Sequence, residues 1–415
     1  VHLAFFSANN VYWKTRWEDN YQTLVCYKEG AIGESGCGTK CDPLPDVWTG
    51  LWRDGCAPTY APNDGCLPEG SLVGQMSWTQ STGSIKVPDT YKNLRFWKNT
   101  SIAALGASQT AVLPYGTLGN EWDPEQLTST YPQHRIILSN TIQTGNVHKM
   151  ALYRHSSGAL VFSAGTMQWP WGLDSAHDLN TANPPLQPVS ADMQQATVNL
   201  LHDMGVNPAT LQGDLVTPTI GPDVVAPASI ISYPTHNSTV PGGSITLTGT
   251  SADNVGGGAV AGVEVSLDNG ATWNNAFGLE NWSYTFAPLN NATITIKVRA
   301  WDDLGNVEIA GSPGSPNCIT ISPSGPFYHS VFNSTYPTTV PSFNTGDSVE
   351  LGMKFRSTVP GFITGFRYYK GAGVTGVHTG HLWSNTGTLL ASQVFINETA
   401  LGWQVATLTT PVAIN

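Results

Sequence analysis

Hydrophobic residues follow a mixed pattern in the first half of the chain. Residues 1 to 212 carry short apolar runs such as LAFFSA, TLVCYK and ALVFSAGTM, which are typical of strands. They end in the segment VSADMQQATVNLLHDMGV, where Met193, Ala196 and Leu200 recur at helical spacing and Gly205 follows as a C-cap. The first region is therefore predicted to combine strands with one terminal helix.

The second half of the chain alternates with period two. Between residues 226 and 322 the runs GVEVSLDNGATW, WSYTF and ITIKVRAWDD place Val263, Val265 and Leu267 on one face of a strand. From residue 326 to 415, short apolar and aromatic runs are cut by Gly, Asn and Thr. Both regions are predicted to be antiparallel β-sandwiches without a helix longer than two turns, and a Pro-rich connector at 217–234 precedes them.

These patterns place several large apolar residues in the predicted cores. Core positions in the second region are Trp273, Val298 and Trp301. In the third region they are Phe355, Phe366, Tyr368 and Trp383.

Composition narrows the class of protein. Charged residues make up 11% of the 415 residues and the formal net charge is −11, while Trp alone numbers 14. Low charge with many aromatic residues argues against disorder, and the absence of a basic patch argues against nucleic acid as a partner. No run of 18 apolar residues occurs, so we expect no membrane span in this segment.

Cysteines cluster in a polar loop. Cys37, Cys41, Cys56 and Cys66 lie in a Gly-, Pro- and Asp-rich stretch, which predicts two local disulfides and an oxidising compartment. Pairing Cys37 with Cys41 and Cys56 with Cys66 is the simplest of three connectivities. A zinc site is the alternative, although no His lies among these cysteines.

The two remaining cysteines and the glycosylation sequons are relevant to the same question of cellular compartment. Cys26 is predicted to be a buried free thiol, and Cys318 has no evident partner. Six Asn-x-Ser/Thr sequons permit glycosylation of an exported protein. They lie at Asn99, Asn237, Asn281, Asn291, Asn333 and Asn397.

Several segments of the first region resemble one family. AFFSANNVYWKTRWE, TLVCYK, TGLWRD, PEGSLVGQM, GTLGNEWD, SGALVFSAGTMQWPWGLD and QQATVNLLHDMGV look like the C-terminal part of the N,N-dimethylformamidase large (beta) subunit. That resemblance implies a three-layer α/β core similar to glutamine-amidotransferase folds. It also implies amide hydrolysis at an iron ion held by two tyrosines and one glutamate. The matching ligand candidates are Tyr12 and Glu121, with a second tyrosine expected upstream. Position 119, two residues before the glutamate, is where a catalytic histidine is sought, and it is Gly.

Each of these residues also has a structural interpretation. Tyr12 can be an aromatic plug at a strand end, and Glu121 an acid near a helix that begins around Pro124. Trp169 and Trp171 alternate on a segment expected to be extended, which suits a core contribution better than a sugar platform. His378 and His381 give H-x2-H without a third ligand, so we interpret them as surface histidines.

The later regions carry resemblances of their own. VAGVEVSLDNGATW and IKVRAWDDLGNVE resemble bacterial Ig-like modules, and residues 355–403 resemble a bacterial domain of unknown function found in large secreted Ig-module proteins. Asp302, Asp303 and Asn306 are read as an Asx-type turn, with calcium ligation as the alternative.

The predicted fold class is multidomain. An α/β domain at 1–212 is followed by an Ig-like β-sandwich at 226–322 and a jelly-roll-like β-sandwich at 326–415. We expect the first domain to be incomplete at its N-terminus and the last at its C-terminus, as in a piece of a longer exported polypeptide.

Two functions follow from these patterns. The favoured one is an exported, extracellular or cell-surface bacterial protein with a structural or assembly role, which needs no cofactor. Its partners would be other copies of itself or surface polysaccharide components. The alternative is a secreted iron-dependent amidohydrolase tethered by its β-sandwiches. No catalytic nucleophile arrangement is assigned, because no G-x-S-x-G elbow occurs.

The cysteine cluster generates the first testable prediction. Cys37, Cys41, Cys56 and Cys66 should be oxidised in pairs, because their loop has too few apolar residues to be held by burial. Peptide mass mapping without reduction checks this, with Cys26 as the free-thiol control. Alkylation of the four cluster cysteines to the same extent as Cys26 would contradict it.

Overall fold

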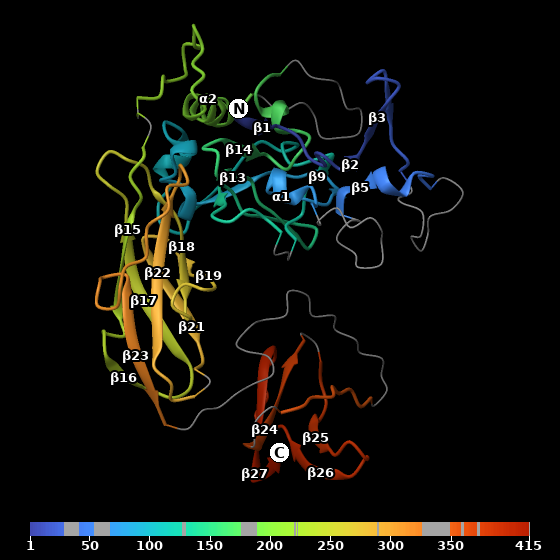
Figure 1. The fold of residues 1–415 in the computed structure, drawn as a ribbon, viewed down its shortest axis with the longest axis vertical. Coiled ribbons are helices and arrows are strands. Elements are labelled where there is room, and N and C mark those ends of the chain that lie inside the picture. The colour runs from blue at the N-terminus through green and yellow to red at the C-terminus, as the bar shows by residue number, and fades with distance from the viewer. Residues whose placement is uncertain are drawn as a thin grey trace. The chain divides into compact units, whose positions relative to one another are not determined.

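The structure is a computed structural model, and it forms two compact units, Val1–His329 and Ser330–Asn415 (Figure 1). The first predicted domain and the Ig-like region therefore share one unit. The residues described are 1–28, 41–53, 67–126, 130–175, 189–219, 221, 223–288, 290–325, 349–357, 361–371 and 374–414.

Within its described residues, the first domain is built from short strands and two α-helices. The helices are α1 (Gly70–Val73) and α2 (Ala191–Asp203), and the 3-10 helices are η1 (Pro45–Val47), η3 (Asp89–Tyr91), η4 (Arg95–Trp97), η5 (Ser101–Ala104) and η6 (Trp169–Gly172). The strands are β1 (Leu3–Phe5), β2 (Trp13–Lys14), β3 (Arg16–Glu18), β4 (Thr23–Val25), β5 (Gly50–Leu51), β6 (Thr79–Gln80), β7 (Lys86–Pro88), β8 (Thr110–Val112), β9 (Glu121–Trp122), β10 (Ile136–Ile137), β11 (Thr141–Gln143), β12 (Asn146–His148), β13 (Ala151–Arg154) and β14 (Leu160–Ser163).

One four-stranded sheet in the order β1-β14-β13-β10 organises this domain. Strand β1 runs parallel to β14, whereas the other pairs are antiparallel. The described residues thus form a β-rich domain, and the predicted three-layer α/β arrangement is not confirmed. Frequent Gly and Pro residues keep the strands short, and α2 is the one helix of the described ranges that is long enough to cover a sheet face.

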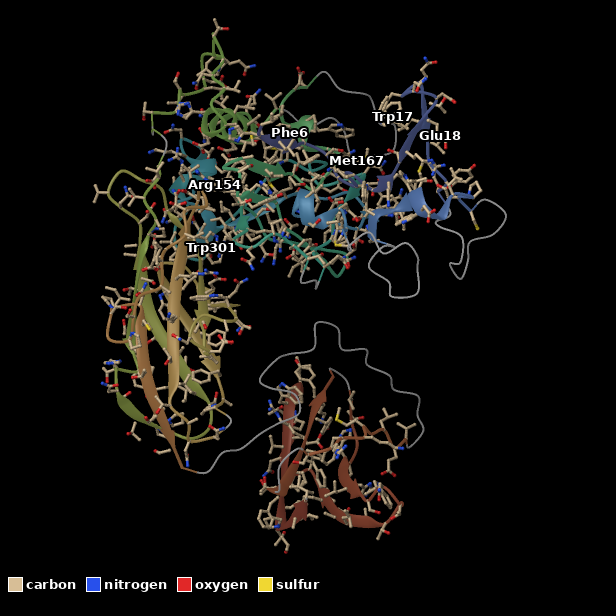
Figure 2. All side chains as sticks on the ribbon, in the orientation of Figure 1. Phe6, Trp17, Glu18, Arg154, Met167 and Trp301 are labelled. Atoms are coloured by element: carbon tan, nitrogen blue, oxygen red, sulfur yellow. The ribbon has the colours of Figure 1, made fainter. Side chains whose placement is uncertain are left out.

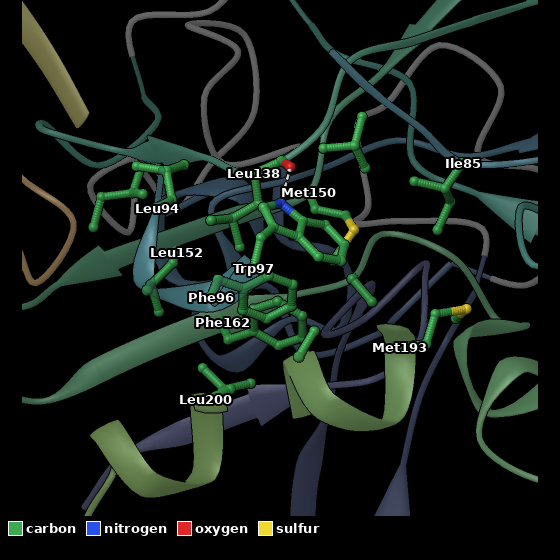
Figure 3. Packing of buried hydrophobic residues seen from close by; sticks show 14 of the residues in the cluster. Ile85, Leu94, Phe96, Trp97, Leu138, Met150, Leu152, Phe162, Met193 and Leu200 are labelled. Carbon is green, nitrogen blue, oxygen red and sulfur yellow. Dashed lines mark hydrogen bonds between the residues drawn. The ribbon is translucent and has the colours of Figure 1, made fainter. Parts of the chain in front are cut away.

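Helix α2 forms where the periodicity predicts it. The Ser190 side chain accepts a hydrogen bond from Met193 N at the N-cap, and Gly205 follows the helix with a left-handed φ of 79°. Met193 and Leu200 reach a core that also contains Phe96 and Phe162, whose rings stack at 5.5 Å (Figure 3). The amphipathic face therefore packs on the sheet as expected.

The Ig-like region is a sandwich of two sheets, ordered β15-β17-β21-β20 and β16-β23-β22-β18-β19. Its strands are β15 (Ala228–Tyr233), β16 (Ser238–Pro241), β17 (Ile245–Ala252), β18 (Val260–Ser266), β19 (Asn274–Asn275), β20 (Phe277–Gly278), β21 (Asn281–Phe286), β22 (Ile294–Asp302) and β23 (Cys318–Ser324). Val263 and Val265 are buried and Leu267 packs against the same core, as the alternation predicts.

Two aromatic assignments in this sandwich need correction. Trp301 is buried, but it belongs to the core of the first domain rather than to that of the sandwich. Trp273 is half-buried, with its ring 4.1 Å from the Arg299 guanidinium, so it is not a core residue. Trp282, which the pattern did not single out, fills the sandwich core beside Val298.

The first domain and the Ig-like sandwich share an interface with apolar and polar contacts, which is called here the seam. Trp301 and Leu304, at and just beyond the end of β22, pack into the core that contains Phe162. Arg154 Nε donates to Leu304 O at 2.6 Å, and Figure 2 shows Arg154 and Trp301 at this seam. His134 Nε2 lies 2.9 Å from Glu264 Oε1 on β18. These contacts fix the sandwich against the first domain.

The second unit consists of two antiparallel strand pairs, β24 with β27 and β25 with β26. Their bounds are β24 (Gly361–Lys370), β25 (Thr379–Trp383), β26 (Leu389–Val394) and β27 (Gly402–Ile414). No helix lies in the described part of residues 226–415, as predicted. The predicted core positions Phe355 and Trp383 are wrong, because both side chains are exposed; Trp383 instead donates to Glu350 Oε1 at 2.8 Å.

The seam generates a stability prediction. Trp301→Ala should lower the unfolding free energy of the first unit by about 3 to 5 kcal/mol, because it opens a cavity in a core that both domains use. Thermal or urea unfolding measures the loss. The exposed Phe277 provides the control, since Phe277→Ala removes an aromatic side chain from the same sandwich without opening a core. Equal stability of the two variants would contradict a shared core.

Candidate functional site

Two acidic side chains project from β9 and its continuation toward the loop after β1. Asn9 N donates to Asp123 Oδ1 at 2.8 Å, and Asn9 Nδ2 donates to Glu121 Oε2 at 3.1 Å. Alternation along an extended chain places Glu121 and Asp123 on one side and Trp122, which is fully buried, on the other. Asn9 therefore holds both acids together.

Strand direction explains why these segments meet. Strands β1 and β14 are parallel, so the residues that follow both strands lie at the same edge of the sheet. Ala164 N donates to Phe5 O at 2.9 Å, and Asp123 N donates to Gly165 O at 2.9 Å. The loops after β1 and β14 thus enclose Asp123 from two sides.

The loop after β1 adopts an unusual backbone conformation. Asn9 has a φ of 55° and Val11 a φ of 54°, both in the left-handed region. Asn tolerates this region, whereas a β-branched residue is strained there. Such strain persists where the surroundings impose it, and it is concentrated at functional sites.

A buried ion pair adjoins the two acids. Arg53 Nη2 pairs with Glu69 Oε1, and Glu69 is almost completely buried. The Arg53 guanidinium also lies 5.2 Å from the centre of the Tyr12 ring, within cation–π range. These residues, together with Asn9, Glu121 and Asp123, form what is called here the acidic cluster.

Burial changes the protonation of one member of the acidic cluster. Burial raises the pKa of Asp123 to about 7, the nearby Glu69 charge acts in the same direction, and the hydrogen bond from Asn9 partly opposes it. Asp123 is therefore largely protonated in mildly acidic solution and exchanges its proton near neutral pH. A carboxyl group tuned to this range is suited to proton transfer.

Several buried polar atoms in and next to the acidic cluster have no hydrogen-bond partner within the described ranges. They are Asn9 Oδ1, Asn10 Nδ2, Arg53 Nε and Glu69 Oε2. Buried polar groups are nearly always paired in native proteins. These donors and acceptors therefore gather at one place in the described part of the chain.

The predicted iron ligands are not joined by a described contact. Glu121 bonds to Asn9, whereas the Tyr12 ring contacts Trp13 and Arg53. A Cβ at Gly119 would stand 2.6 Å from Gln168 Oε1, so the position of the missing histidine is filled by a different side chain. The second tyrosine ligand is expected upstream of Tyr12, so the iron site that the resemblance implies stays a prediction.

Two structural interpretations in this region also need revision. No helix begins at Pro124; Glu121 lies on strand β9, paired with β6. Trp169 is fully buried, as expected for a core residue, but η6 is a 3-10 helix rather than an extended segment, because Pro170 occupies its first turn. Trp171 is half-buried.

The described residues include some of the cysteines and sequon asparagines but not all of them. Cys37, Cys56 and Cys66 lie outside the described residues, so the predicted pairing stays a prediction. Cys26 and Cys318 are free, as expected, although Cys26 is only half-buried. Five sequon asparagines are exposed and Asn333 lies outside the described residues; those five are Asn99, Asn237, Asn281, Asn291 and Asn397.

The turn after β22 forms as an Asx turn. Asp302 Oδ1 accepts from Leu304 N at 2.9 Å and from Asn306 N at 2.8 Å. Ligand oxygens of Asp302, Asp223 and Asp253 lie within 4.8 Å of one another. Asp303 is not part of this group: its carboxyl points to Arg95 N, at 2.6 Å.

The histidines of the second unit bond to acids. His378 Nδ1 lies 2.9 Å from Glu398, which also accepts from Lys370 Nζ at 2.6 Å. His381 Nδ1 lies 3.1 Å from Glu350. Each histidine has its own carboxylate partner, in agreement with the interpretation that they are not a ligand pair.

Most of the acidic cluster was missed by sequence reasoning. Glu121 and Tyr12 were found through resemblance, whereas Asn9, Glu69 and Asp123 were not. Asp123 carried one usable signal, since it stands two residues after Glu121 on an extended segment. Nothing in the sequence linked Arg53 to Glu69.

Family models match three successive parts of the chain. Residues 1–183 match the C-terminal region of N,N-dimethylformamidase beta subunit-like proteins, residues 227–307 match a bacterial Ig domain, and residues 334–415 match a domain of unknown function termed DUF4082. The three-part organisation inferred from sequence is therefore confirmed. No curated protein matches the chain.

Three solved structures that are similar to this chain have low sequence identity to it, and the matched part covers less than half of each structure's own length. The sulfane dehydrogenase SoxCD from Paracoccus pantotrophus is 23% identical over 20% of this chain and 23% of its own, with a TM-score of 0.17. The endo-β-1,4-mannanase from Thermotoga petrophila is 7% identical over 34% and 25%, with a TM-score of 0.20. Domains 4–9 of the surface layer protein SbsC are 11% identical over 65% and 39%, with a TM-score of 0.17.

The buried Asp123 generates a pH prediction. Because its folded pKa is raised, the folded protein keeps a proton that the unfolded chain releases above pH 4, so Asp123 costs stability as pH rises toward 7. The unfolding free energy of Asp123→Asn minus that of the native chain should therefore increase between pH 4 and pH 8, by up to about 4 kcal/mol.

Urea unfolding at several pH values measures this difference. His148 shows the opposite trend, because burial lowers its pKa to about 4, but it is present in both proteins and cancels. The exposed Asp46 provides the control substitution, Asp46→Asn. Parallel stability curves for Asp123→Asn and the native chain would rule out the raised pKa.

Proposed function

We propose that this chain is part of an exported bacterial surface or assembly protein, in which the dimethylformamidase-like domain acts mainly as a scaffold. Its partners are other copies of the protein or surface polysaccharide, in the extracellular space or on the cell surface. The observation that carries the proposal is the seam that fixes the sandwich to the first domain through Trp301 and Leu304. A tethering module on a free linker would not need a shared core.

The second unit offers surfaces for chain-to-chain contact. Strand β24 pairs with β27 alone within the described residues, so the described part of this sheet has an unpaired edge on each side. Phe362 on β24 is 67% exposed and Val405 on β27 is 63% exposed. Unpaired edges that carry exposed apolar side chains favour strand addition between copies.

A second candidate function is amide hydrolysis, and the acidic cluster is the observation that favours it. Asp123 is an acid whose proton is exchangeable near neutral pH, and Glu121 is a half-buried carboxylate beside it. Asp123 would supply a proton to a departing amine, and Glu121 would accept one from attacking water. Iron would enter only with ligands beyond those described.

The two functions predict opposite results for the same variants. Under the scaffold proposal, self-association measured by sedimentation velocity falls in Phe362→Asp and Val405→Asp, and remains unchanged in Tyr12→Phe and Glu121→Gln. The charge changes weaken association because a charged group at a strand edge opposes pairing. Iron content by elemental analysis and amide turnover stay at background.

The hydrolase candidate replaces the scaffold proposal under a different outcome. Stoichiometric iron, a visible tyrosinate band and amide turnover that are all lost in Tyr12→Phe and Glu121→Gln would establish it. A purely monomeric chain at high concentration, with or without polysaccharide, would overturn the assembly proposal directly.

A further inference from the structure

A basic cavity lies at the seam between the first domain and the sandwich. Its volume is about 380 Å³, within the range of small-ligand sites. Its lining comes from η4, η5 and neighbouring residues on one side and from the loop before β18 on the other. These residues are Lys92, Asn93, Arg95, Lys98, Ala103, Gly256, Gly257 and Gly258.

The charge of this lining differs from that of the chain. Three of its residues are cationic and none is acidic, whereas the chain as a whole has a net charge of −11. Lys92 Nζ donates to Leu105 O at 2.6 Å, which fixes the ammonium group near the cavity. Asp203 pairs with Arg95, and the carboxylates of Asp223 and Asp303 lie next to the glycine loop, so the positive charge available to a ligand is that of Lys92 and Lys98.

Arg95 is the fixed part of the cavity. Its side chain is 5% exposed, and its Nη2 atom donates to Asp203 Oδ1 at 2.6 Å and to Gly221 O at 3.2 Å. The Nε atom is buried and has no partner within the described part of the chain. A buried guanidinium held by two partners and retaining a spare donor is a preorganised anion ligand.

Glycines form the opposite wall. Arg95 Cδ, to which Nε is bonded, lies 3.3 Å from where a Cβ on Gly258 would stand, so the spare donor borders the wall made by this loop. A side chain at Gly257 or Gly258 would clash with the carboxylates of Asp223 or Asp303, and Gly256 has a left-handed φ of 84°. Only glycine keeps this wall open and close to Arg95.

We propose that this cavity binds an oxyanion, a phosphate or sulfate group, between Arg95, Lys92 and Lys98. Arg95 Nε supplies a directed hydrogen bond, and the two lysines supply charge. The same group occurs as a free ion and as the phosphate of a glycerol-phosphate polymer, and the cavity recognises their shared chemistry. Binding would link the two domains, since its ligands come from η4 and the residues that flank it, while the far wall of the cavity belongs to the sandwich.

Isothermal titration with inorganic phosphate, inorganic sulfate and a glycerol-phosphate oligomer tests this at constant ionic strength. We expect saturable binding with one site per chain. Lys92→Gln and Lys98→Gln should each weaken it about tenfold, because each removes a charge-assisted contact. Lys86→Gln, which removes an exposed lysine from the same domain, serves as the matched control and should bind normally.

Further variants separate a folding defect from a binding defect. Arg95→Lys keeps the charge but removes Nε and weakens the buried pair with Asp203, so its unliganded Tm should fall. Binding is therefore compared at a temperature at which circular dichroism shows this variant to be folded, and it should still be weaker than in Lys86→Gln. Tighter binding of the oligomer than of free phosphate identifies the polymer as the source, and equal binding identifies the free ion. Absence of saturable binding, or equal weakening in Lys86→Gln, would overturn the proposal.

Discussion

The hydrophobic contact of Trp301 with the first domain is the interaction on which the arrangement of the first unit depends. An Ig-like sandwich has its own core, here built around Trp282 and Val298, and needs no outside partner to bury it. Trp301 and Leu304 nevertheless leave that core at the end of β22 and enter the neighbouring one. Because interiors are close-packed, this insertion fixes orientation as well as contact.

Polar contacts then refine what the apolar seam establishes. Arg95 N donates to Asp303 Oδ2 at 2.6 Å while its guanidinium pairs with Asp203, so one residue joins η4 to both the sandwich and helix α2. Burial raises the pKa of Asp303 to about 7, and its Oδ1 atom has no partner within the described ranges. The seam therefore contains a carboxyl group that gains charge near neutral pH. Its polar contacts depend on pH, whereas the apolar contacts of Trp301 and Leu304 do not.

Local pattern was sufficient for much of the fold. Helix α2 and the faces of β18 follow from periodicity alone, because each buries one side against a single neighbour. Trp301 was misplaced for a different reason: alternation states which face is buried but not which core receives it. The predicted core positions of Phe355 and Trp383 are wrong for a similar reason, since a pattern of apolar and aromatic residues does not distinguish a core from an exposed strand face. The acidic cluster as a whole could not be predicted from the sequence pattern, because Arg53 and Glu69 meet only through tertiary structure.

The acidic cluster and the seam differ in their energetic effect on the first domain: the cluster costs stability, whereas the seam contributes to it. Spare polar atoms around Asn9 and the strained φ of Val11 are costs that a domain acting only as a scaffold has no reason to keep. Gln168 nevertheless fills the space beside Gly119 where a further catalytic side chain would project. In this respect the described residues differ from the pattern that the resemblance implies. Under the scaffold proposal, the acidic cluster would hold a polar group within a domain whose orientation the seam fixes.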